Sequence, residues 1–265
     1  MSVFESIILG AVQGIAEWLP VSSEGMIVLV KNNFFGGGPL ADTIKMALFL
    51  HLGTFLAVLI YFRKDVKNVS LRFFGKEKSE ESGKILRFII IATLISGVLG
   101  WGLLELLTNL ENSIILTTRF INVAIAVLLA ITGVAQLKKK KNSGHRSASE
   151  LKDGDSVLLG IAQGAAVLPG LSRSGLTVSV LLLRNFQDTQ ALRLSFLLSL
   201  PIVLAGNIIL NFNQAIFSLD NLIAFFSSFV FGYITINLFI KLAKKINFGW
   251  FAVIFAGLVF VSVFL

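Results

Sequence analysis

Residues 12–26 read VQGIAEWLPVSSEGM, and they interrupt a segment that is otherwise apolar. Pro20 lies near the middle of the apolar region 3–35, and a proline inside a helical pattern ends or kinks the helix. Each of the two resulting segments is shorter than the roughly 20 residues that cross a bilayer core. We therefore expect region 3–35 to form a re-entrant helical hairpin, which enters the membrane and returns to the side from which it came.

The composition around this stretch is typical of a membrane protein. Of 265 residues, 55% are hydrophobic and only 14% are charged, whereas soluble domains carry roughly 25% charged residues. The absence of cysteine excludes disulfide bonds and thiolate chemistry. Six further windows approach the length of a membrane span: about 43–62, 85–107, 114–137, 190–211, 217–240 and 246–265. We therefore predict an all-α polytopic membrane protein with six transmembrane helices and re-entrant hairpins.

A second interrupted region and the basic residues together predict the topology. Region 155–186 is apolar but is broken by the Pro-Gly pair at 169–170, which predicts a second re-entrant hairpin. Of 23 lysines and arginines, eight lie in 63–87, six in 138–152 and three in 241–245. These segments share one face if both interrupted regions return to their own side, and the positive-inside rule makes that face cytoplasmic. The first hairpin then lies at the outer face and the second at the cytoplasmic face. Because the net charge of +8 follows this topology, it does not indicate nucleic-acid binding.

An internal repeat relates the two interrupted regions. A shift of 150 residues aligns residues 9–30 with 159–180 and gives nine identities in 22 positions. Each repeat contains one re-entrant hairpin and three spans, and because three is odd the second repeat is inverted relative to the first. Inverted repeats with discontinuous helices are typical of transporters, whose sites lie where the broken helices meet. We predict a single membrane domain, 1–265, with these parts: repeat one at 1–137, a charged loop at 64–84 within it, a polar cytoplasmic linker at 138–154, and repeat two at 155–265.

The second interrupted region carries a cluster suited to phosphate. Its sequence VLPGLSRSGLTVS (167–179) places Arg173 between Ser172 and Ser174, with Thr177 one turn beyond. Small hydroxyl residues after a Pro-Gly break favour the start of a helix, where unpaired N–H groups and the positive end of the helix dipole point at one spot. With a guanidinium and three hydroxyls, such a spot is an oxyanion site, and phosphate is the expected ligand. The alternative is that Arg173 only reaches to the membrane interface while the serines cap a helix.

The first interrupted region supplies a carboxylate and further hydroxyls. Gln13 and Glu17 are four residues apart and share one helix face. Glu17 is a candidate general acid or base, a ligand for a cation that accompanies a diphosphate, or simply the ion-pair partner of Arg173. Ser22 and Ser23 follow the break as candidate helix caps or phosphate ligands, or as a nucleophile in the case of one of them.

Two motifs together resemble the undecaprenyl-diphosphate phosphatase family, which is also known as the bacitracin-resistance proteins. QGIAEWLPVSS matches the family pattern (E/Q)GxxEFLPxSSxGH, and PGLSRSGLT matches PGxSRSxxT. The resemblance covers nearly the whole chain. It implies hydrolysis of the terminal phosphate of a polyprenyl diphosphate at the outer face of the membrane, which regenerates the lipid carrier for peptidoglycan and other surface glycans. It also implies an inverted-repeat fold with re-entrant helices.

The residues and the resemblance together give nine candidate site residues. Catalysis is expected from Glu17 as acid or base, from Ser23 as nucleophile or hydrogen-bond donor, and from Arg173. Substrate binding is expected from six further polar residues: Gln13, Ser22, Glu24, Ser172, Ser174 and Thr177. Glu17 is also the candidate ligand for a divalent cation, Mg²⁺ or Ca²⁺, that bridges to the diphosphate.

One position departs from the family pattern. Met26 stands where the pattern has histidine, and methionine can neither transfer a proton nor attack phosphorus. Three alternatives follow: Glu24 or Glu17 transfers the proton, His51 reaches the site, or hydrolysis is weak or absent. His51 lies inside the first full span, where a lone histidine is more often a hydrogen-bonded packing residue.

The sequence leaves two functions open. The first is a membrane phosphatase that converts undecaprenyl (polyprenyl) diphosphate to the monophosphate and so recycles the lipid carrier for cell-envelope glycan synthesis. The second is a non-hydrolytic lipid-phosphate binder or transporter (a flippase) on the same scaffold. For either function we expect a multi-pass protein of the cell membrane with a polyprenyl diphosphate lipid as partner, without nucleic acid and without an organic cofactor. A homodimer stays open.

Overall fold

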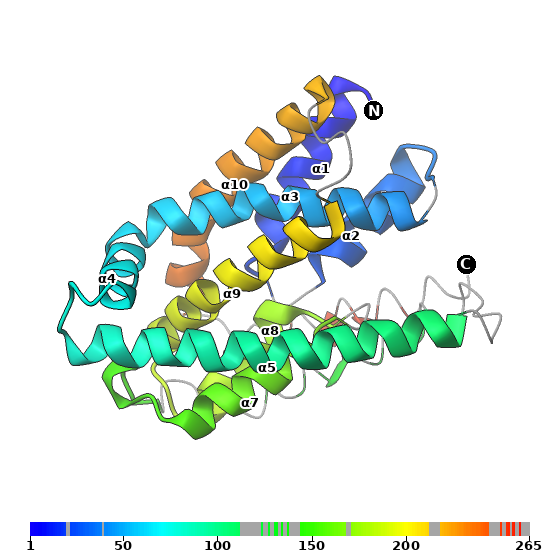
Figure 1. The fold of residues 1–265 in the computed structure, drawn as a ribbon. Helices are drawn as coiled ribbons and strands as arrows, with labels where there is room; N and C mark the ends of the chain where they lie inside the picture. The colour runs from blue at the N-terminus through cyan, green and yellow to red at the C-terminus, as the bar shows by residue number, and fades with distance from the viewer. Residues whose placement is uncertain are drawn as a thin grey trace.

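The computed structural model describes residues 1–19, 22–38, 40–111, 144–167, 171–211 and 218–243, with single positions between 123 and 137 and between 250 and 260. These residues form mainly helices (Figure 1), in the order α1 (Val3–Ala16), α2 (Ser23–Phe34), α3 (Leu40–Tyr61), α4 (Arg63–Phe73), α5 (Glu80–Glu111), the 3₁₀ helix η1 (Ala148–Glu150), α7 (Asp153–Ala165), α8 (Arg173–Leu183), α9 (Asp188–Asn211) and α10 (Leu219–Ala243). In the described ranges, β structure is limited to an isolated bridge between Arg146 and Phe186. The prediction of an all-α fold is confirmed for this part of the chain.

Four helices are long and apolar enough to cross a membrane, by length and composition. The apolar stretches are Asp42–Tyr61 in α3, Glu80–Leu103 in α5, Asp188–Ile209 in α9 and Leu219–Lys241 in α10. They coincide with four of the six predicted spans. The other two predicted spans, 114–137 and 246–265, lie outside the continuously described ranges.

Both interrupted regions form a pair of short helices in place of one span. The first pair is α1 and α2, and the second is α7 and α8. The second helix of each pair begins with the same cap. Ser22 Oγ accepts a hydrogen bond from the Gly25 N–H at 3.2 Å. Ser172 Oγ accepts one from the Gly175 N–H at 3.0 Å. A serine at this position satisfies one of the unpaired N–H groups of the first turn, which explains where each helix begins.

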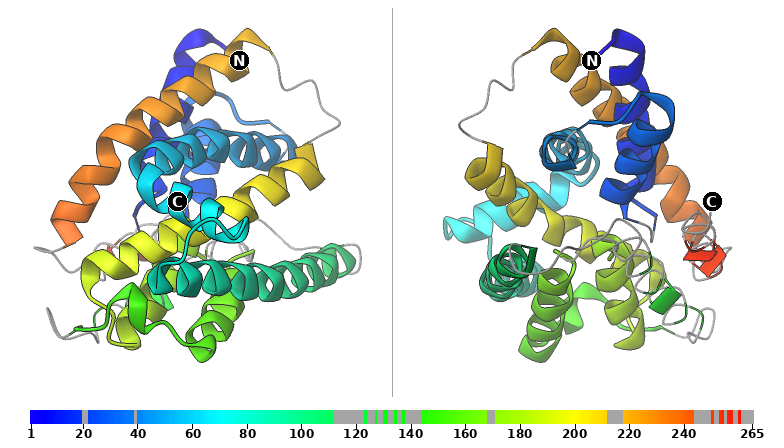
Figure 2. Two further views of the ribbon diagram at one scale, coloured as in Figure 1. Left: turned by 60° about the vertical axis from the view of Figure 1, so that its left-hand side comes forward. Right: turned by 90° about the vertical axis from the view of Figure 1, so that its right-hand side faces the viewer.

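The first helix of each pair packs on the other half of the chain. α1 lies along α10, and α7 lies along α5 (Figures 1 and 2). Glycines allow the close approach. A Cβ on Gly14 of α1 would lie only 2.6 Å from the backbone nitrogen of Gly232 in α10. A Cβ on Gly164 of α7 would lie 2.9 Å from Cβ of Leu99 in α5. Small residues that bring helices together are typical of membrane proteins, and here they interlock the two halves.

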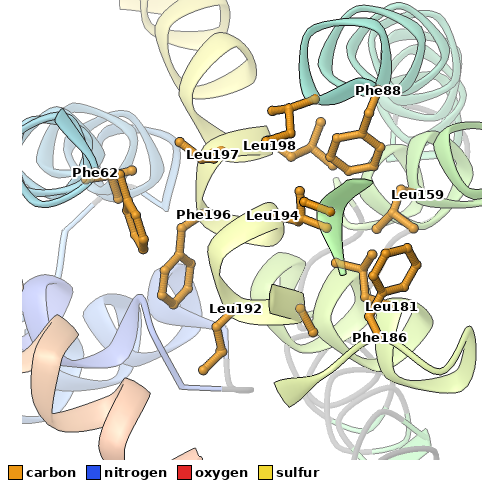
Figure 3. Packing of buried hydrophobic residues seen from close by; sticks show 14 of the residues in the cluster. Phe62, Phe88, Leu159, Leu181, Phe186, Leu192, Leu194, Phe196, Leu197 and Leu198 are labelled. Carbon is orange, nitrogen blue, oxygen red and sulfur yellow. The ribbon is translucent and has the colours of Figure 1, made fainter. Parts of the chain in front are cut away.

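A buried cluster of large side chains is centred on α9, which passes between α3 and α5 (Figure 1). Figure 3 shows Phe196 of α9 beside Phe62, and Leu198 of α9 lying toward Phe88 of α5. Phe196 also contacts Trp18 edge-on, with the ring centroids 4.9 Å apart. Through these contacts α9 joins the turn after α1 to the helices α5, α7 and α8.

The charged segment after α3 is more ordered than the sequence predicts. The prediction of a loop at 64–84 is wrong at both ends, because Arg63–Phe73 form α4 and α5 already begins at Glu80. Val66 and Val69 of α4 pack on the core, whereas Lys64 and Lys67 are exposed. The two valines are three residues apart and therefore share one helix face, a short apolar stripe that the surrounding charges obscure in the sequence.

The described part of the predicted linker, 144–154, packs against the turn between α8 and α9. Arg146 donates to both oxygens of Asp155 at 3.2 and 2.7 Å, and its guanidinium carbon lies 4.2 Å from the centre of the Phe186 ring. Arg184 Nε donates to the same carboxylate at 2.7 Å. Burial by itself would raise the pKa of Asp155, but the hydrogen bonds from Arg146 and Arg184 outweigh it and hold that pKa below its usual value. This cluster fixes the start of α7 to the end of α8.

Candidate functional site

A cavity of about 50 Å³ lies where the two interrupted helix pairs meet. Its lining comes from the first pair (Glu17, Ser22, Ser23 and Glu24), from α3 (His51) and from the second pair (Ala166, Leu171, Ser172, Arg173 and Ser174). Seven of the nine candidate site residues are among them. The fold therefore brings together polar groups that lie about 150 residues apart in the sequence.

Glu17 is at the centre of the polar contacts. It lies in the turn after α1 and is only 6% exposed. Its Oε1 pairs with the guanidinium of Arg173 from α8. Its Oε2 accepts hydrogen bonds from Gln13 Nε2 at 2.8 Å and from Ser23 Oγ at 3.1 Å. Since removing one partner of a buried ion pair leaves an uncompensated charge, Glu17 and Arg173 stabilise each other and tie the first helix pair to the second.

Two serines at the start of α8 make a second link between the helix pairs. Ser172 Oγ and Ser174 Oγ donate to the carbonyl oxygen of Leu19 at 3.3 and 2.8 Å. The two hydroxyls lie 3.1 Å from each other. The start of α8 also carries the positive end of the helix dipole, to which Arg173 adds a full charge. Hydroxyls and positive charge gathered at one helix start are suited to bind phosphate.

His51 of α3 completes the wall of the cavity. Its Nε2 lies 3.3 Å from Glu17 Oε2 and 3.5 Å from Ser23 Oγ. Its Nδ1 lies 2.7 Å from the carbonyl oxygen of Ala47. The sequence favours a packing role for this residue, but the structure places it in the site. His51 and Ser23 are 28 residues apart and share no local motif, so the one available signal is a histidine inside an apolar span.

α10 supports both segments that carry these groups. Trp18 Nε1 donates to the carbonyl oxygen of Gly232 and to Thr235 Oγ1, each at 3.1 Å, which fixes the turn containing Glu17. Ser228 Oγ of α10 donates to the carbonyl oxygen of α3 residue Leu50 at 2.8 Å. The relative position of Glu17 and the neighbouring part of α3 is thus set by contacts with one helix.

Gln13 and Thr177 lie behind the lining of the cavity. Gln13 is fully buried and holds Glu17 through its Nε2, while its Oε1 has no hydrogen-bond partner among the described residues. Thr177 is also fully buried. Its Oγ1 donates to the carbonyl oxygen of Arg173 at 2.8 Å and lies 2.6 Å from Ser195 Oγ. In this arrangement Gln13 orients a carboxylate, and Thr177 fixes the first turn of α8.

The donors in this geometry do not fit a resident divalent cation. The oxygens of Glu17 are engaged by Arg173, Gln13 and Ser23, and a guanidinium stands next to the carboxylate where a cation would bind. In the part of the chain that the structure describes, no group of three or more His, Cys, Asp or Glu residues is arranged to hold a metal ion. Hard divalent cations need several oxygen ligands, which this site does not offer by itself.

Comparison with known proteins identifies the family. The family model described as Bacitracin resistance protein BacA matches residues 6–261. A protein of Methanococcoides burtonii named Undecaprenyl-diphosphatase is 38% identical over 260 residues, which are 96% of this chain and 95% of the relative. Relatives of the same name from Haloarcula marismortui and Caldicellulosiruptor bescii are 38% and 34% identical. They cover 97% and 95% of this chain, and 95% and 93% of their own length.

These matches extend over nearly the whole chain and confirm the resemblance carried by the two motifs. Together with the four long apolar helices, they make this a multi-pass membrane protein. The chain belongs to the BacA family of bacitracin-resistance proteins.

Proposed function

We propose that the protein is an integral membrane phosphatase that hydrolyses undecaprenyl (polyprenyl) diphosphate to the monophosphate and phosphate. The monophosphate is the lipid carrier that cell-envelope glycan synthesis, including peptidoglycan synthesis, uses again. The observation that carries the proposal is the cavity in which Arg173 and two serines of one helix pair face Glu17 and Ser23 of the other. The relatives named above, all called undecaprenyl-diphosphatase, support the same reaction.

In this proposal the second helix pair binds the diphosphate. Arg173 exchanges the Glu17 carboxylate for phosphate oxygens, which its planar guanidinium can hold with two hydrogen bonds. Ser172 and Ser174 turn their hydroxyls from the carbonyl of Leu19 to the same oxygens. A cavity of about 50 Å³ admits a group of phosphate size, so the polyprenyl chain stays in the surrounding lipid.

The first helix pair carries the reacting groups. Ser23 attacks the terminal phosphorus or donates a hydrogen bond to the transferred group, and Glu17 acts as acid or base or compensates positive charge nearby. Ser22 and Glu24 line the cavity on the same side and contact the substrate, while Gln13 orients Glu17 from behind.

The proposal includes the finer topology: six spans and two re-entrant pairs in an inverted repeat, with the site toward the outer face and the basic loops cytoplasmic. The equivalent caps at Ser22 and Ser172, and the reciprocal packing of α1 on α10 and of α7 on α5, support the repeat. Since the chain has no cysteine, single cysteines can be introduced and labelled from one side. A membrane-impermeant maleimide should label Asn33→Cys from outside and Lys67→Cys only after the membrane is opened; the reverse result would overturn the orientation.

Two further parts of the proposal concern partners. The proposed metal partner is a divalent cation, Mg²⁺ or Ca²⁺; Glu17 would be the residue that holds it, together with oxygens of the substrate, and the cation would compensate charge on the diphosphate, so a chelator should lower the rate of hydrolysis. A homodimer is the proposed assembly, which the mass of the detergent-solubilised particle tests. If a chelator leaves the rate of hydrolysis unchanged, the divalent cation is not part of the reaction. If the particle has the mass of a monomer, the homodimer is wrong.

The test of the reaction is phosphate release from polyprenyl diphosphate by the purified protein in detergent. Arg173→Ala and Glu17→Ala should each lower the rate by at least about 10²–10³-fold, the usual effect of removing one group that stabilises developing charge. Arg63→Ala, which removes an exposed guanidinium on α4, is the matched control. Wild-type rates in both site variants would show the assignment to be wrong. Lipid movement across liposomes without phosphate release would favour a transporter, a function that the named relatives do not support.

A further inference from the structure

We propose that His51 accepts the proton of the Ser23 hydroxyl during hydrolysis and is therefore a further catalytic residue of this site. The role belongs to the phosphatase reaction proposed above and depends on it. The supporting observation lies outside both sequence motifs: the imidazole on α3 faces the cavity, with Nε2 at 3.5 Å from Ser23 Oγ.

A backbone contact determines which nitrogen of the imidazole is the acceptor. Nδ1 lies 2.7 Å from the carbonyl oxygen of Ala47, and because a carbonyl only accepts, Nδ1 carries the hydrogen. In neutral His51 the unprotonated nitrogen is then Nε2. This is the atom that lies against Ser23 Oγ and Glu17 Oε2, so the neutral side chain presents its basic nitrogen to the hydroxyl.

The charged groups around the cavity favour proton transfer to His51 once substrate is bound. Glu17, Glu24 and Arg173 are the charged groups that face it. Glu17 Oε2 lies 3.3 Å from Nε2 and stabilises the imidazolium that forms. Arg173 is the partner of Glu17 in the free protein. When the guanidinium turns to phosphate, the carboxylate becomes available to compensate the charge on His51.

α3 holds the imidazole in a fixed place. Thr54 Oγ1 donates to the carbonyl oxygen of His51 at 3.0 Å, and Ser228 Oγ of α10 donates to that of Leu50 at 2.8 Å. A Cβ on Gly53 would lie 2.7 Å from Ser228 Cβ, so α3 and α10 are in close contact at this level. A base must lie within hydrogen-bonding reach of the proton that it takes, and this packing maintains that condition.

The other residues near Ser23 are less suited to the role. Glu17 accepts from the hydroxyl too, but its Oε2 also accepts from Gln13, and in the substrate complex its charge is needed to stabilise the imidazolium of His51. Met26 lies on α2 outside the residues that line the cavity, and a thioether does not transfer protons. His51 combines contact with Ser23 and an imidazole nitrogen that can take up a proton beside a carboxylate.

The bonds and the proton balance over two steps. In the first, Ser23 Oγ bonds to the terminal phosphorus while the bond from phosphorus to the bridging oxygen breaks. The lipid monophosphate leaves with that electron pair, and the hydroxyl proton passes to His51 Nε2. In the second, water attacks phosphorus, the bond to Ser23 Oγ breaks, and Oγ takes the proton back from Nε2. Phosphate leaves, and one proton of the attacking water is released to solvent.

The experiment compares the two histidines of the chain in the purified full-length protein, with polyprenyl diphosphate as the probe. His51→Gln keeps a polar side chain of similar length and should lower kcat by about 10²–10⁴-fold with little change in KM. His145→Gln is the matched control, since His145 is exposed in the linker, and it should leave both constants unchanged. Thermal unfolding and gel filtration of each variant separate loss of chemistry from loss of fold.

A second readout distinguishes proton transfer from a structural role. The acid limb of the pH profile of kcat/KM reports the base of the free enzyme, and in His51→Gln it should move to lower pH, where carboxylates titrate. If His51→Gln does not fold, His51→Asn, with a shorter side chain, is measured in the same way. A folded variant with the wild-type kcat and an unchanged pH profile would overturn the role of His51.

Arg173→Ala, measured alongside, separates this inference from the proposed function. If Arg173→Ala and His51→Gln both keep the wild-type rate, the phosphatase site itself is wrong. If Arg173→Ala is inactive while His51→Gln is unaffected, the site stands and the role of His51 is overturned. The double variant His51→Gln/Met26→His should remain impaired, since position 26 lies outside the cavity lining; full recovery would place the base on α2 instead.

Discussion

α2 and α8 begin with the same cap but carry different chemistry. Ser22 and Ser172 accept from the equivalent glycine N–H groups, so both helices start at the same point of the repeat. The two positions that follow differ: Ser23 and Glu24 in α2, Arg173 and Ser174 in α8. The cap therefore determines where the first turn lies, and in the proposed reaction the residues on that turn decide whether it binds the diphosphate or presents reacting groups to it.

The contacts that hold the two interrupted helix pairs in place differ as well. α1 is held on α10 by contacts between backbones, together with the hydrogen bonds of Trp18 to Gly232 and Thr235. α7 meets mainly side chains of α5, such as that of Leu99. We therefore expect the contact of α1 with α10 to tolerate an added methyl group less well than the contact of α7 with α5.

The largest effect on stability is expected from breaking the ion pair that joins the two halves. Arg173→Met leaves Glu17 buried without its partner and should lower the free energy of unfolding by about 3–5 kcal/mol. The double variant Glu17→Gln/Arg173→Met removes both charges and should regain most of that stability while it remains inactive. Thermal unfolding in detergent and phosphate release measure the two properties. A double variant as unstable as the single one would contradict the role of the pair in joining the halves.

A smaller loss of stability is expected from adding a methyl group at the glycines Gly14 and Gly164, and the loss should differ between the two. A Cβ at position 14 meets the backbone of α10, at 2.6 Å from Gly232 N and 2.7 Å from Ser228 O, so Gly14→Ala should cost about 1–3 kcal/mol. It should also lower activity, because a shift of α1 moves Glu17. Gly164→Ala meets the side chain of Leu99, which can adjust, and should cost less. Equal melting temperatures of the two variants would contradict the expected difference between the contact of α1 with α10 and that of α7 with α5.

The two caps are expected to differ by about the energy of one hydrogen bond. Ser22→Ala loses the cap of α2 and should cost about 1 kcal/mol. Ser172→Ala loses a cap and also the bond to Leu19, and should cost about 1 kcal/mol more. Ser22→Gly is the control. Because glycine is tolerated at the N-cap of a helix, it should cost only a few tenths of a kcal/mol. Equal costs for the two alanine variants would show that the bond to Leu19 contributes nothing.

The smallest expected effect concerns the stability of the protein at acid pH. The pKa of Asp155 is lowered in the folded protein because Arg146 and Arg184 bond the ionised form, which therefore stabilises the fold above the unfolded pKa of about 3.8. That contribution is lost as the pH falls below 3.8 and through the folded pKa. Asp155→Asn should flatten the fall of the melting temperature in this range. Glu5→Gln, at the equivalent position of the first repeat, is the control. Glu5 accepts a hydrogen bond from the backbone N–H of Ser2 in the capping box of α1. An unchanged acid transition in Asp155→Asn would exclude the cluster as its cause.

Local chemistry predicts the interrupted helices. A proline or Pro-Gly pair followed by a capping serine favours the end of one helix and the start of the next, as at Ser22 and Ser172, so both breaks can be located without tertiary contacts. Length and hydropathy predict the four long apolar helices for a similar reason, because the signal lies within each segment.

Features that depend on packing are harder to predict. His51 lines the cavity, and Gly53 beside it allows α3 to approach α10 closely, but neither residue is marked by the motifs around Glu17. Thr177 shares a motif with Arg173 but points to Ser195, since its place on the helix turns it away from the cavity. Sequence identifies which residues are polar within apolar segments, and tertiary structure decides which of them meet.

The interlocked packing has a consequence for biosynthesis. The turn that carries Glu17 is held by Gly232 and Thr235, and the carboxylate finds its guanidinium at Arg173, all of them residues that leave the ribosome long after α1. The first half therefore enters the membrane before Glu17 has its ion-pair partner Arg173 and before α10 covers the glycines of α1. We therefore expect that a fragment that stops before α10 lacks the support of the turn with Glu17, and that the nascent chain becomes active only after its last third has been inserted.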